Sequence, residues 1–166
     1  MYTSVSTRFR KQMPRHYKPQ IFIAILLSLA VSACSSSSSE QQASQFEVIR
    51  VIDGDTVVIA GDERVRLIGI DTPENGQCGF DEAKQALENL LASGPATFYS
   101  GTTSDRDKYD RMLRYIEVEE IDVGLNLISN GFAIARYDSR DGYGPHDRES
   151  KYIAADDNST PAIKCN

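Results

Sequence analysis

Apolar and β-branched residues recur in short runs through the middle of this chain, with polar turns between them. The runs are "FEVIRVI" (46–52), "TVVIA" (56–60) and "RVRLIGI" (64–70), and they are separated by "DGD" and "GDE". Runs of this kind, bounded by Asp and Gly, are typical of strands joined by tight turns. The pattern therefore predicts three consecutive antiparallel strands.

The spacing of apolar residues then changes to that of a helix. In "DEAKQALENLLAS" (81–93), Ala and Leu recur three or four positions apart, and Gly-Pro follows, which predicts an amphipathic helix. The segment "IDVGLNLISNG" (121–131) predicts a second helix that stops at Asn-Gly. A short third helix is expected within residues 147–155.

Two further runs have the composition of strands. They are "ATFYS" (96–100) and "MLRYIEV" (112–118), and the polar loop "SDRDKYDR" lies between them. Three strands, a helix, two strands and a helix fit a β-rich α+β fold, a five-stranded OB-fold Greek-key barrel with two or three helices.

The hairpin between residues 56–60 and 64–70 brings two aspartates toward each other. With its turn centred on Asp62 and Glu63, Asp55 faces Ile70, and Asp71 lies one residue farther along. Because neighbouring strands are about 5 Å apart, both carboxylates can reach one ion. Two hard oxygen ligands favour Ca²⁺ or Mg²⁺ over zinc.

Arg66 can approach both aspartates only if the strand that carries it departs from regular alternation. By strict alternation Arg66 and Asp71 point to opposite faces, so their convergence requires a bulge or twist between them. Gly69, or the bend at Thr72-Pro73, is the expected place for it.

The N-terminus has the pattern of an export signal. Residues 1–33 carry five basic residues, no acidic ones and the apolar run "IFIAILLSLAVSA" (21–33), which is shorter than the roughly 20 residues that span a bilayer. The following "VSAC" resembles the bacterial lipoprotein signal, which implies cleavage before Cys34 and acylation of that cysteine. An ordinary secreted protein, cut nearby, is the alternative.

These features divide the chain into a lipoprotein-type signal peptide (1–33), a Ser-rich tether (34–45) and one domain (46–166). Several acyl chains on Cys34 would anchor the protein stably in a membrane. The expected location is the cell envelope, lipid-anchored to the outer membrane because Ser35 follows the cysteine. We expect a monomer.

Charge and cysteine content narrow the chemistry of the domain. Beyond residue 33 there are 13 basic and 24 acidic residues, so polyanions would not be held by bulk electrostatics. Any action on nucleic acid must come from local arginines or a bound cation. Cys78 and Cys165 remain; an oxidising compartment favours a disulfide between them, with two unpaired thiols as the alternative.

Four motifs in matching order, "VIDGDT", "VRLIGIDTPE", "DKYDR" and "NGFA", resemble the staphylococcal nuclease (thermonuclease) family. The resemblance extends over roughly residues 48–137. It implies an OB-fold barrel and Ca²⁺-dependent endonucleolytic hydrolysis of DNA and RNA, with products that end in a 3′-phosphate.

The resemblance also implies roles for individual residues. The implied Ca²⁺ ligands are Asp55, Asp71 and the backbone carbonyl of Thr72, with Asp53 in support. The implied catalytic residues are Arg66, Glu74 and Arg111, and the implied substrate-binding residues are Lys108, Tyr109 and Tyr137.

The chemistry accounts for these residue types. A cation neutralises the phosphodiester, two guanidiniums meet the charge that develops on the phosphoryl oxygens, and Glu74 orients or deprotonates the attacking water.

The sequence departs from the family pattern at several positions. Asp110 stands where the family usually has glycine, and the loop after Glu74 is short. Ser139 occupies the place of a second nucleotide-contacting tyrosine, with Tyr143 farther on, and the domain is acidic where the family prototype is basic. Weaker substrate binding is the expected consequence; for the acidic charge, a home at high ionic strength, where long-range charge is screened, is the alternative.

Other functions remain open at this point. The main alternative is a non-catalytic OB-fold lipoprotein of the envelope that binds nucleic acid or protein, although such a module has no need of Arg66, Glu74 and Arg111 together. A structural lipoprotein stabilised by Ca²⁺ would leave both arginines unexplained. His146 is the only histidine beyond residue 33, which argues against histidine nucleases, zinc sites and Ser-His-Asp hydrolases.

Overall fold

The computed structural model describes residues 42–101, 104–162 and 165, all of which belong to one compact unit, residues 37–166. The predicted signal peptide and Cys34 lie outside the described residues. Within the described part of the chain, no helix has the length and apolar character needed to cross a membrane.

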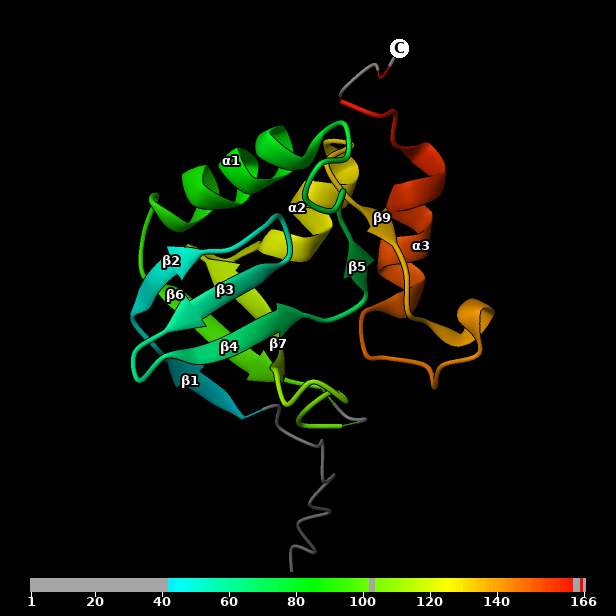
Figure 1. Ribbon diagram of the computed structural model, residues 1–166. Coiled ribbons are helices and arrows are strands. Elements are labelled where there is room, and N and C mark those ends of the chain that lie inside the picture. The colour runs from blue at the N-terminus through cyan, green and yellow to red at the C-terminus, as the bar shows by residue number, and fades with distance from the viewer. Residues whose placement is uncertain (1–41, 102–103, 163–164, 166) are drawn as a thin grey trace, which may run out of the picture. The chain divides into compact units, whose positions relative to one another are not determined.

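A seven-stranded sheet forms the barrel (Figure 1). Six strands follow one another in the order β1-β6-β7-β4-β3-β2, and β8 pairs with β7. The strands are β1 (Ala43–Gln45), β2 (Val48–Val51), β3 (Thr56–Ile59), β4 (Glu63–Leu67), β6 (Ala96–Ser100), β7 (Met112–Val118) and β8 (Ile121–Asp122).

The chain order and the sheet order differ at two pairings, β1 with β6 and β4 with β7. Strands β2, β3 and β4 are an antiparallel meander, whereas β4 pairs parallel with β7, with Val65 opposite Met112. This parallel pairing gives the barrel its Greek-key path, and the fold is the predicted OB-fold of the β-rich α+β class.

A separate two-stranded ribbon continues from the barrel. After Leu67 the chain turns through Gly69, whose φ is +78°, and forms β5 (Ile70–Asp71), which pairs with β9 (Ile134–Ala135). A side chain at Gly69 would also collide with the ring of His146. The turn between Arg66 and Asp71 therefore lies at Gly69, one of the two places expected from the sequence, and it depends on glycine.

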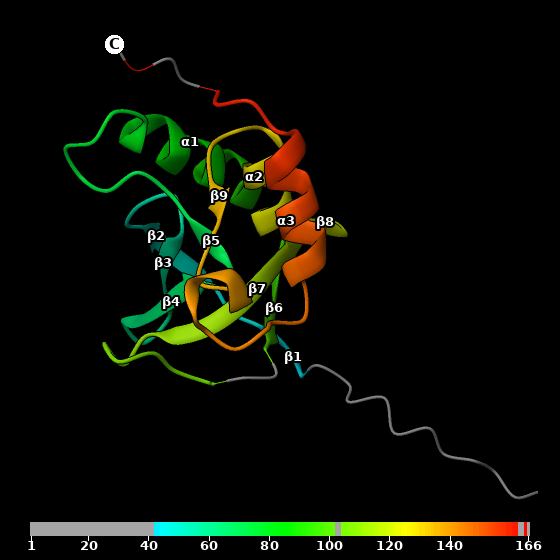
Figure 2. The same cartoon turned by 90° about the vertical axis from the view of Figure 1, so that its right-hand side faces the viewer.

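In the described part of the chain, three α-helices pack on the strands (Figures 1 and 2). α1 (Phe80–Leu91) buries Ala83 and Leu87 and contacts β2; α2 (Val123–Ser129) contacts β7 and α1; α3 (Glu149–Asn158) packs on α2 and beside β9. A one-turn 3₁₀ helix, η1 (Ser139–Asp141), precedes α3. Asp122 caps α2 by accepting a hydrogen bond from the Leu125 N–H, and Gly131 follows its end at φ +72°.

The apolar core lies between the barrel and the helices. All four residues of β3 are buried, which explains the continuous rather than alternating apolar run. The largest buried side chains are Tyr115, Tyr152, Phe98, Ile70, Leu87, Ile116, Leu127 and Ile128. They come from strands and helices alike, so this core supports the ribbon as well as the barrel.

Two details of the predicted strands were wrong. The β3–β4 register places Thr56 opposite Arg66, and the turn lies at residues 60–62, where Gly61 and Asp62 have positive φ. Asp55 therefore faces Leu67 rather than Ile70. The backbone carbonyl of Asp55 accepts a hydrogen bond from the Leu67 N–H at 2.8 Å. The last residues of the predicted tether, Ala43–Gln45, form β1 and pair with β6.

Candidate active site

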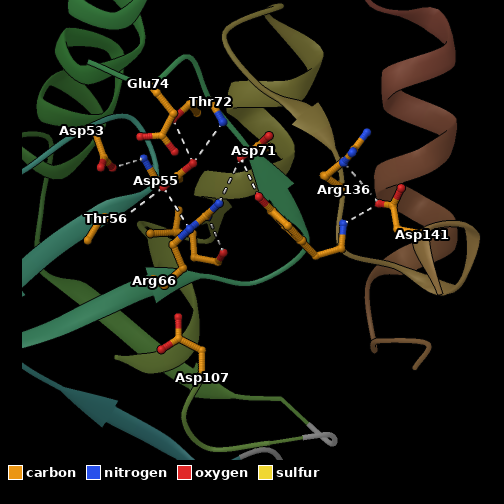
Figure 3. A network of polar contacts seen from close by, with 12 residues as sticks. Asp53, Asp55, Thr56, Arg66, Asp71, Thr72, Glu74, Asp107, Arg136 and Asp141 are labelled. Atoms are coloured by element: carbon orange, nitrogen blue, oxygen red, sulfur yellow. Dashed lines mark hydrogen bonds and ion pairs between the residues drawn. The ribbon is translucent and has the colours of Figure 1, made fainter. Parts of the chain in front are cut away.

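The residues of interest lie where the β2–β3 turn, the end of β4 and the start of the loop after β5 meet (Figure 3). Asp53 accepts a hydrogen bond from the Asp55 N–H at 3.1 Å, which shapes the turn. Gly54 lies against Ala83 and Thr72, each closer than a Cβ would permit. The turn thus approaches α1 and Thr72 closely because its central residue has no side chain.

Asp55 is the most enclosed acid of the site, with 4% of its surface exposed. Its Oδ2 accepts hydrogen bonds from the Thr72 N–H at 3.0 Å and the Thr72 hydroxyl at 2.9 Å. Its Oδ1 accepts from the Thr56 hydroxyl at 3.1 Å and lies 3.1 Å from Arg66 Nε. The carboxylate ties β3, β4 and the chain after β5 together.

Arg66 bridges the two aspartates. In addition to the Asp55 contact, its Nη2 lies 3.3 Å from Asp71 Oδ1, and its Nη1 donates to the Leu67 carbonyl at 3.0 Å. Asp55 and Asp71 therefore converge on one guanidinium, although their strands do not pair as predicted. The Gly69 turn and the β5–β9 ribbon bring Asp71 back to the end of β4.

The environment acts against the charge on Asp55. The pKa of Asp55 is raised to about 6, because burial and the nearby Asp53 carboxylate raise it by more than the Arg66 guanidinium and the Thr72 hydrogen bonds lower it. A buried carboxyl group with one arginine and a second acid beside it gains from any additional cation.

Tyr137, which follows β9, contacts both Asp71 and Arg66. Its hydroxyl donates to Asp71 Oδ1 at 3.3 Å, and the Arg66 Cζ lies 5.5 Å from the centre of its ring. Burial and the Asp71 carboxylate raise the pKa of Tyr137 above its ordinary value, so the phenol keeps its proton at neutral pH. The Tyr143 ring meets the Tyr137 ring edge to face, with centroids 5.5 Å apart.

The "DKYDR" loop presents three predicted residues together. Lys108 Nζ and Arg111 Cζ lie 4.9 Å and 5.4 Å from the centre of the Tyr109 ring, and Tyr109 is 67% exposed. Arg111 directly precedes Met112, which pairs with Val65 on β4. The loop thus emerges beside the strand that carries Arg66.

Asp107 holds this loop and was missed from the sequence. Its Oδ2 lies 2.7 Å from both Nε and Nη2 of Arg111, and its Oδ1 accepts from the N–H groups of Arg111 and Tyr109. Although partial burial works against it, these hydrogen bonds keep the pKa of Asp107 below its usual range. In the sequence Asp107 is one of several acids of a polar loop, and no signal distinguishes it.

Asp110 has the backbone conformation that explains why glycine would suit its position. Its φ is +63°, in the left-handed region that side chains disfavour. Its side chain is 88% exposed and lies 3.5 Å from Arg106. Arg106 in turn pairs with Glu63 at 2.7 Å, so an ion-pair network fastens the loop to the start of β4.

Glu74 stands in the loop that follows β5. Its side chain is exposed and, in Figure 3, points toward Asp55. Its N–H donates to Gln77 Oε1 at 2.8 Å, which fixes the backbone of the loop and leaves the carboxylate directed at the site.

A disulfide joins Cys78, four residues beyond Glu74, to Cys165. The disulfide borders a cavity of about 460 Å³ that Asp71, Thr72 and Pro73 also line. The C-terminal segment is therefore fastened to the loop that carries Glu74.

The donor set fits a hard cation. Two carboxylates that share one guanidinium, together with the carbonyl of Thr72, are oxygen ligands of the kind that Ca²⁺ prefers. Within the described ranges, no three His, Cys, Asp or Glu side chains are grouped closely enough to hold a metal ion. A cation here would depend on backbone oxygen and water beside the two aspartates.

His146 is buried and bonded to the Tyr115 hydroxyl at 2.9 Å.

Comparison with known proteins identifies the family. A family model described as "Staphylococcal nuclease homologue" matches residues 64–158. The chain is 32% identical to the thermonuclease of Staphylococcus intermedius over 125 residues, 68% of each chain. It is 30% identical to the thermonuclease of Staphylococcus hyicus over 119 residues, 64% of this chain and 66% of that protein.

A more distant relative covers more of the chain. It is an uncharacterized endonuclease of Haemophilus influenzae, 24% identical over 139 residues, 81% of this chain and 70% of that protein. The chain thus spans about two thirds of the length of these relatives. With the OB-fold barrel and the four motifs in order, these matches show that the chain belongs to the staphylococcal nuclease family.

Proposed function

We propose that this protein is a Ca²⁺-dependent phosphodiesterase of the thermonuclease type that hydrolyses DNA, RNA or both, by attack of water on phosphorus, to give 3′-phosphate products. One observation carries the proposal: the Arg66 guanidinium lies between Asp55 and Asp71 at the end of β4. An ordinary surface ion pair does not need two converging acids and a nine-tenths buried arginine.

Arg66 and Arg111 bind the scissile phosphate in this mechanism. The contacts of Arg66 within the described residues engage three of its five N–H groups, and the mechanism assigns the other two to a phosphoryl oxygen. Because a guanidinium stays protonated and donates bidentately, both arginines stabilise the charge that grows on these oxygens in the transition state.

Glu74 orients or deprotonates the water that attacks phosphorus. Its exposure and its direction toward Asp55 support this role. Asp55, Asp71 and the Thr72 carbonyl would hold Ca²⁺, and the ion, when bound, supplies charge neutralisation at a non-bridging oxygen. Lys108, Tyr109 and Tyr137 contact the nucleotide through charge and exposed aromatic faces.

We also propose that the protein is a monomer, anchored by acylated Cys34 to the outer membrane. The signal-like N-terminus and the "VSAC" sequence support this location. Metabolic labelling with a radioactive fatty acid tests it: the full-length chain should take up label, and Cys34→Ala should not. Equal labelling of both would refute the anchor.

The activity test uses the chain without residues 1–33, with single- and double-stranded DNA and RNA, in Ca²⁺ or in chelator. Wild type should cleave only in Ca²⁺, and Glu74→Gln and Arg111→Ala should each lose at least about a hundredfold in kcat. Glu82→Gln and Arg50→Ala are matched controls, since both residues are exposed and lie outside the site. Controls and site variants that cleave alike, with or without chelator, would refute the mechanism, and binding without cleavage would favour the non-catalytic module.

A further inference from the structure

Tyr137 has a backbone conformation that its residue type disfavours. Its φ is +60°, which lies in the left-handed region. Glycine and, less often, asparagine adopt this region, whereas a bulky residue such as tyrosine rarely does. Such a conformation persists only where neighbouring groups impose it. The neighbours of Tyr137 therefore explain why its side chain points at Asp71.

Asp141 supplies the imposed contact. Its Oδ2 accepts a hydrogen bond from the Tyr137 N–H at 2.7 Å and also lies 3.5 Å from Arg136 Nε. Figure 3 shows Asp141 beside Arg136 on the segment that follows β9. A charge-assisted hydrogen bond of this length is a strong one, and it binds the peptide group that sets the direction of the tyrosine.

A second acid, Asp138, stabilises the turn that contains η1. Asp138 is buried, accepts from the Arg140 N–H at 2.8 Å and pairs with the Arg140 guanidinium at 2.7 Å. Because Asp138 caps η1, the turn does not depend on Asp141 for its closure. The Asp141 carboxylate instead holds the Tyr137 N–H, at 2.7 Å, and more loosely the Arg136 guanidinium, at 3.5 Å.

From Tyr137 the effect reaches the site directly. The phenol donates to Asp71 and its ring lies against Arg66. A tyrosine that turned away would remove one of the two contacts that hold Asp71 Oδ1, leaving only Arg66 Nη2, and would uncover the guanidinium. Asp141 is thus connected, through a single residue, to a proposed metal ligand and a proposed catalytic arginine.

We propose that Asp141 is a positioning residue for phosphodiester cleavage, which acts by holding Tyr137 against Asp71 and Arg66. The inference rests on the proposed function, and it assigns Asp141 no contact with substrate. An isosteric amide keeps an oxygen that can accept the Tyr137 N–H, whereas a methyl group does not.

The first test compares Asp141→Ala, Asp141→Asn and Ser139→Ala, in the chain without residues 1–33, on one single-stranded DNA oligonucleotide in Ca²⁺. Asp141→Ala should lower kcat about tenfold, and Asp141→Asn should stay within about twofold of wild type. Ser139→Ala removes a hydrogen bond to Glu149 from the same turn without touching Tyr137, and its kcat should not change. Equal losses in Ala and Asn variants, or in Ser139→Ala, would overturn the proposal.

A double-mutant comparison checks the route. Because Asp141 acts through Tyr137, Asp141→Ala should cost less than about twofold in kcat when Tyr137 is already alanine. If the fold-loss of kcat in the double variant equals the product of the losses in the two single variants, Asp141 does not act through Tyr137.

A third readout does not depend on activity. In protein with ¹³C-labelled tyrosine rings, the resonance that Tyr137→Phe removes should shift in Asp141→Ala and stay in place in Ser139→Ala and Asp141→Asn. An unmoved resonance in Asp141→Ala would refute the positioning role even if the enzyme cleaves. A wild-type protein without cleavage activity would refute the proposed function and leave this readout to decide the structural part. If Asp141→Ala does not fold, Asp141→Ser, with a shorter side chain, takes its place.

Discussion

The guanidinium of Arg66 lies against the carboxylate of Asp55, with Nε and Oδ1 3.1 Å apart and both side chains more than nine-tenths buried. Each of the two charges would be costly in this position without the other. The pair therefore serves stability as well as chemistry, and the two effects can be measured separately.

Replacement of Arg66 by methionine should lower the free energy of unfolding by about 3 kcal/mol in chelator, because it leaves Asp55 buried without its cation. Urea denaturation measures the loss. Arg50→Met, on the exposed part of β2, should change stability by less than about 0.5 kcal/mol. The double variant Asp55→Asn/Arg66→Met should recover part of the loss, and a single Arg66→Met variant as stable as Arg50→Met would contradict this account.

Replacement of Asp107 by alanine should lower kcat/KM about tenfold, because Arg111 loses the carboxylate that holds its guanidinium and its N–H. Steady-state cleavage of an oligonucleotide measures the effect. Asp105→Ala is the matched control, since it removes an acid of the same loop that pairs with Arg114. Equal activities of the two variants would show that Arg111 does not need this support.

Acidification should destabilise the protein through His146. Burial lowers the pKa of His146, despite the acids Glu149, Asp138 and Asp147, which raise it. Below the unfolded value of about 6.5 the unfolded chain thus binds more protons than the folded one, so the contribution to stability is complete above that pH and is lost as the pH falls. The slope is at most about 1.4 kcal/mol per pH unit.

Urea denaturation at several pH values between 7.5 and 5 tests this effect. Wild type should lose stability more steeply on acidification than His146→Gln, so the two free energies of unfolding should approach each other. Parallel curves for the two proteins would assign the acid sensitivity to other groups.

Reduction of the disulfide should destabilise the domain strongly. Cys78 and Cys165 are 87 residues apart, and a loop of that size corresponds to about 4–5 kcal/mol of chain entropy in the unfolded state. Thermal unfolding of the wild type with and without reductant measures it. The variant Cys78→Ser/Cys165→Ser should match the reduced wild type and be insensitive to reductant; a reductant effect on that variant would point to another cause.

Local pattern was sufficient for most elements of the fold. The runs at 96–100 and 112–118 are the strands β6 and β7 as predicted, and the Asn-Gly stop ends α2. The β3–β4 register was wrong by three residues because "GDE" does not reveal which residues adopt positive φ; they are Gly61 and Asp62. Strand β1 was missed because Ala43, Ser44 and Gln45 form no run of large apolar or β-branched residues.

The site shows the same division. Acids, arginines and tyrosines in motif order pointed to Asp55, Arg66, Asp71 and Tyr137, which the structure brings together. Asp107 and Asp141 escaped notice, since each is one acid among many in a polar loop. Tyr143, displaced from the place expected for a second aromatic residue, nevertheless packs on Tyr137.

The sequence alone determined the family, the residue types of the site and the periodicity of the strands and helices, because these depend on neighbours within a few positions. The meeting of Arg66, Asp55 and Asp71 was decided by the tertiary structure. Asp71 reaches Arg66 only because Gly69 turns the chain and β5 pairs with β9, more than sixty residues away. Such pairing is stabilised by contacts across the whole domain, so the pattern of neighbouring residues does not predict it.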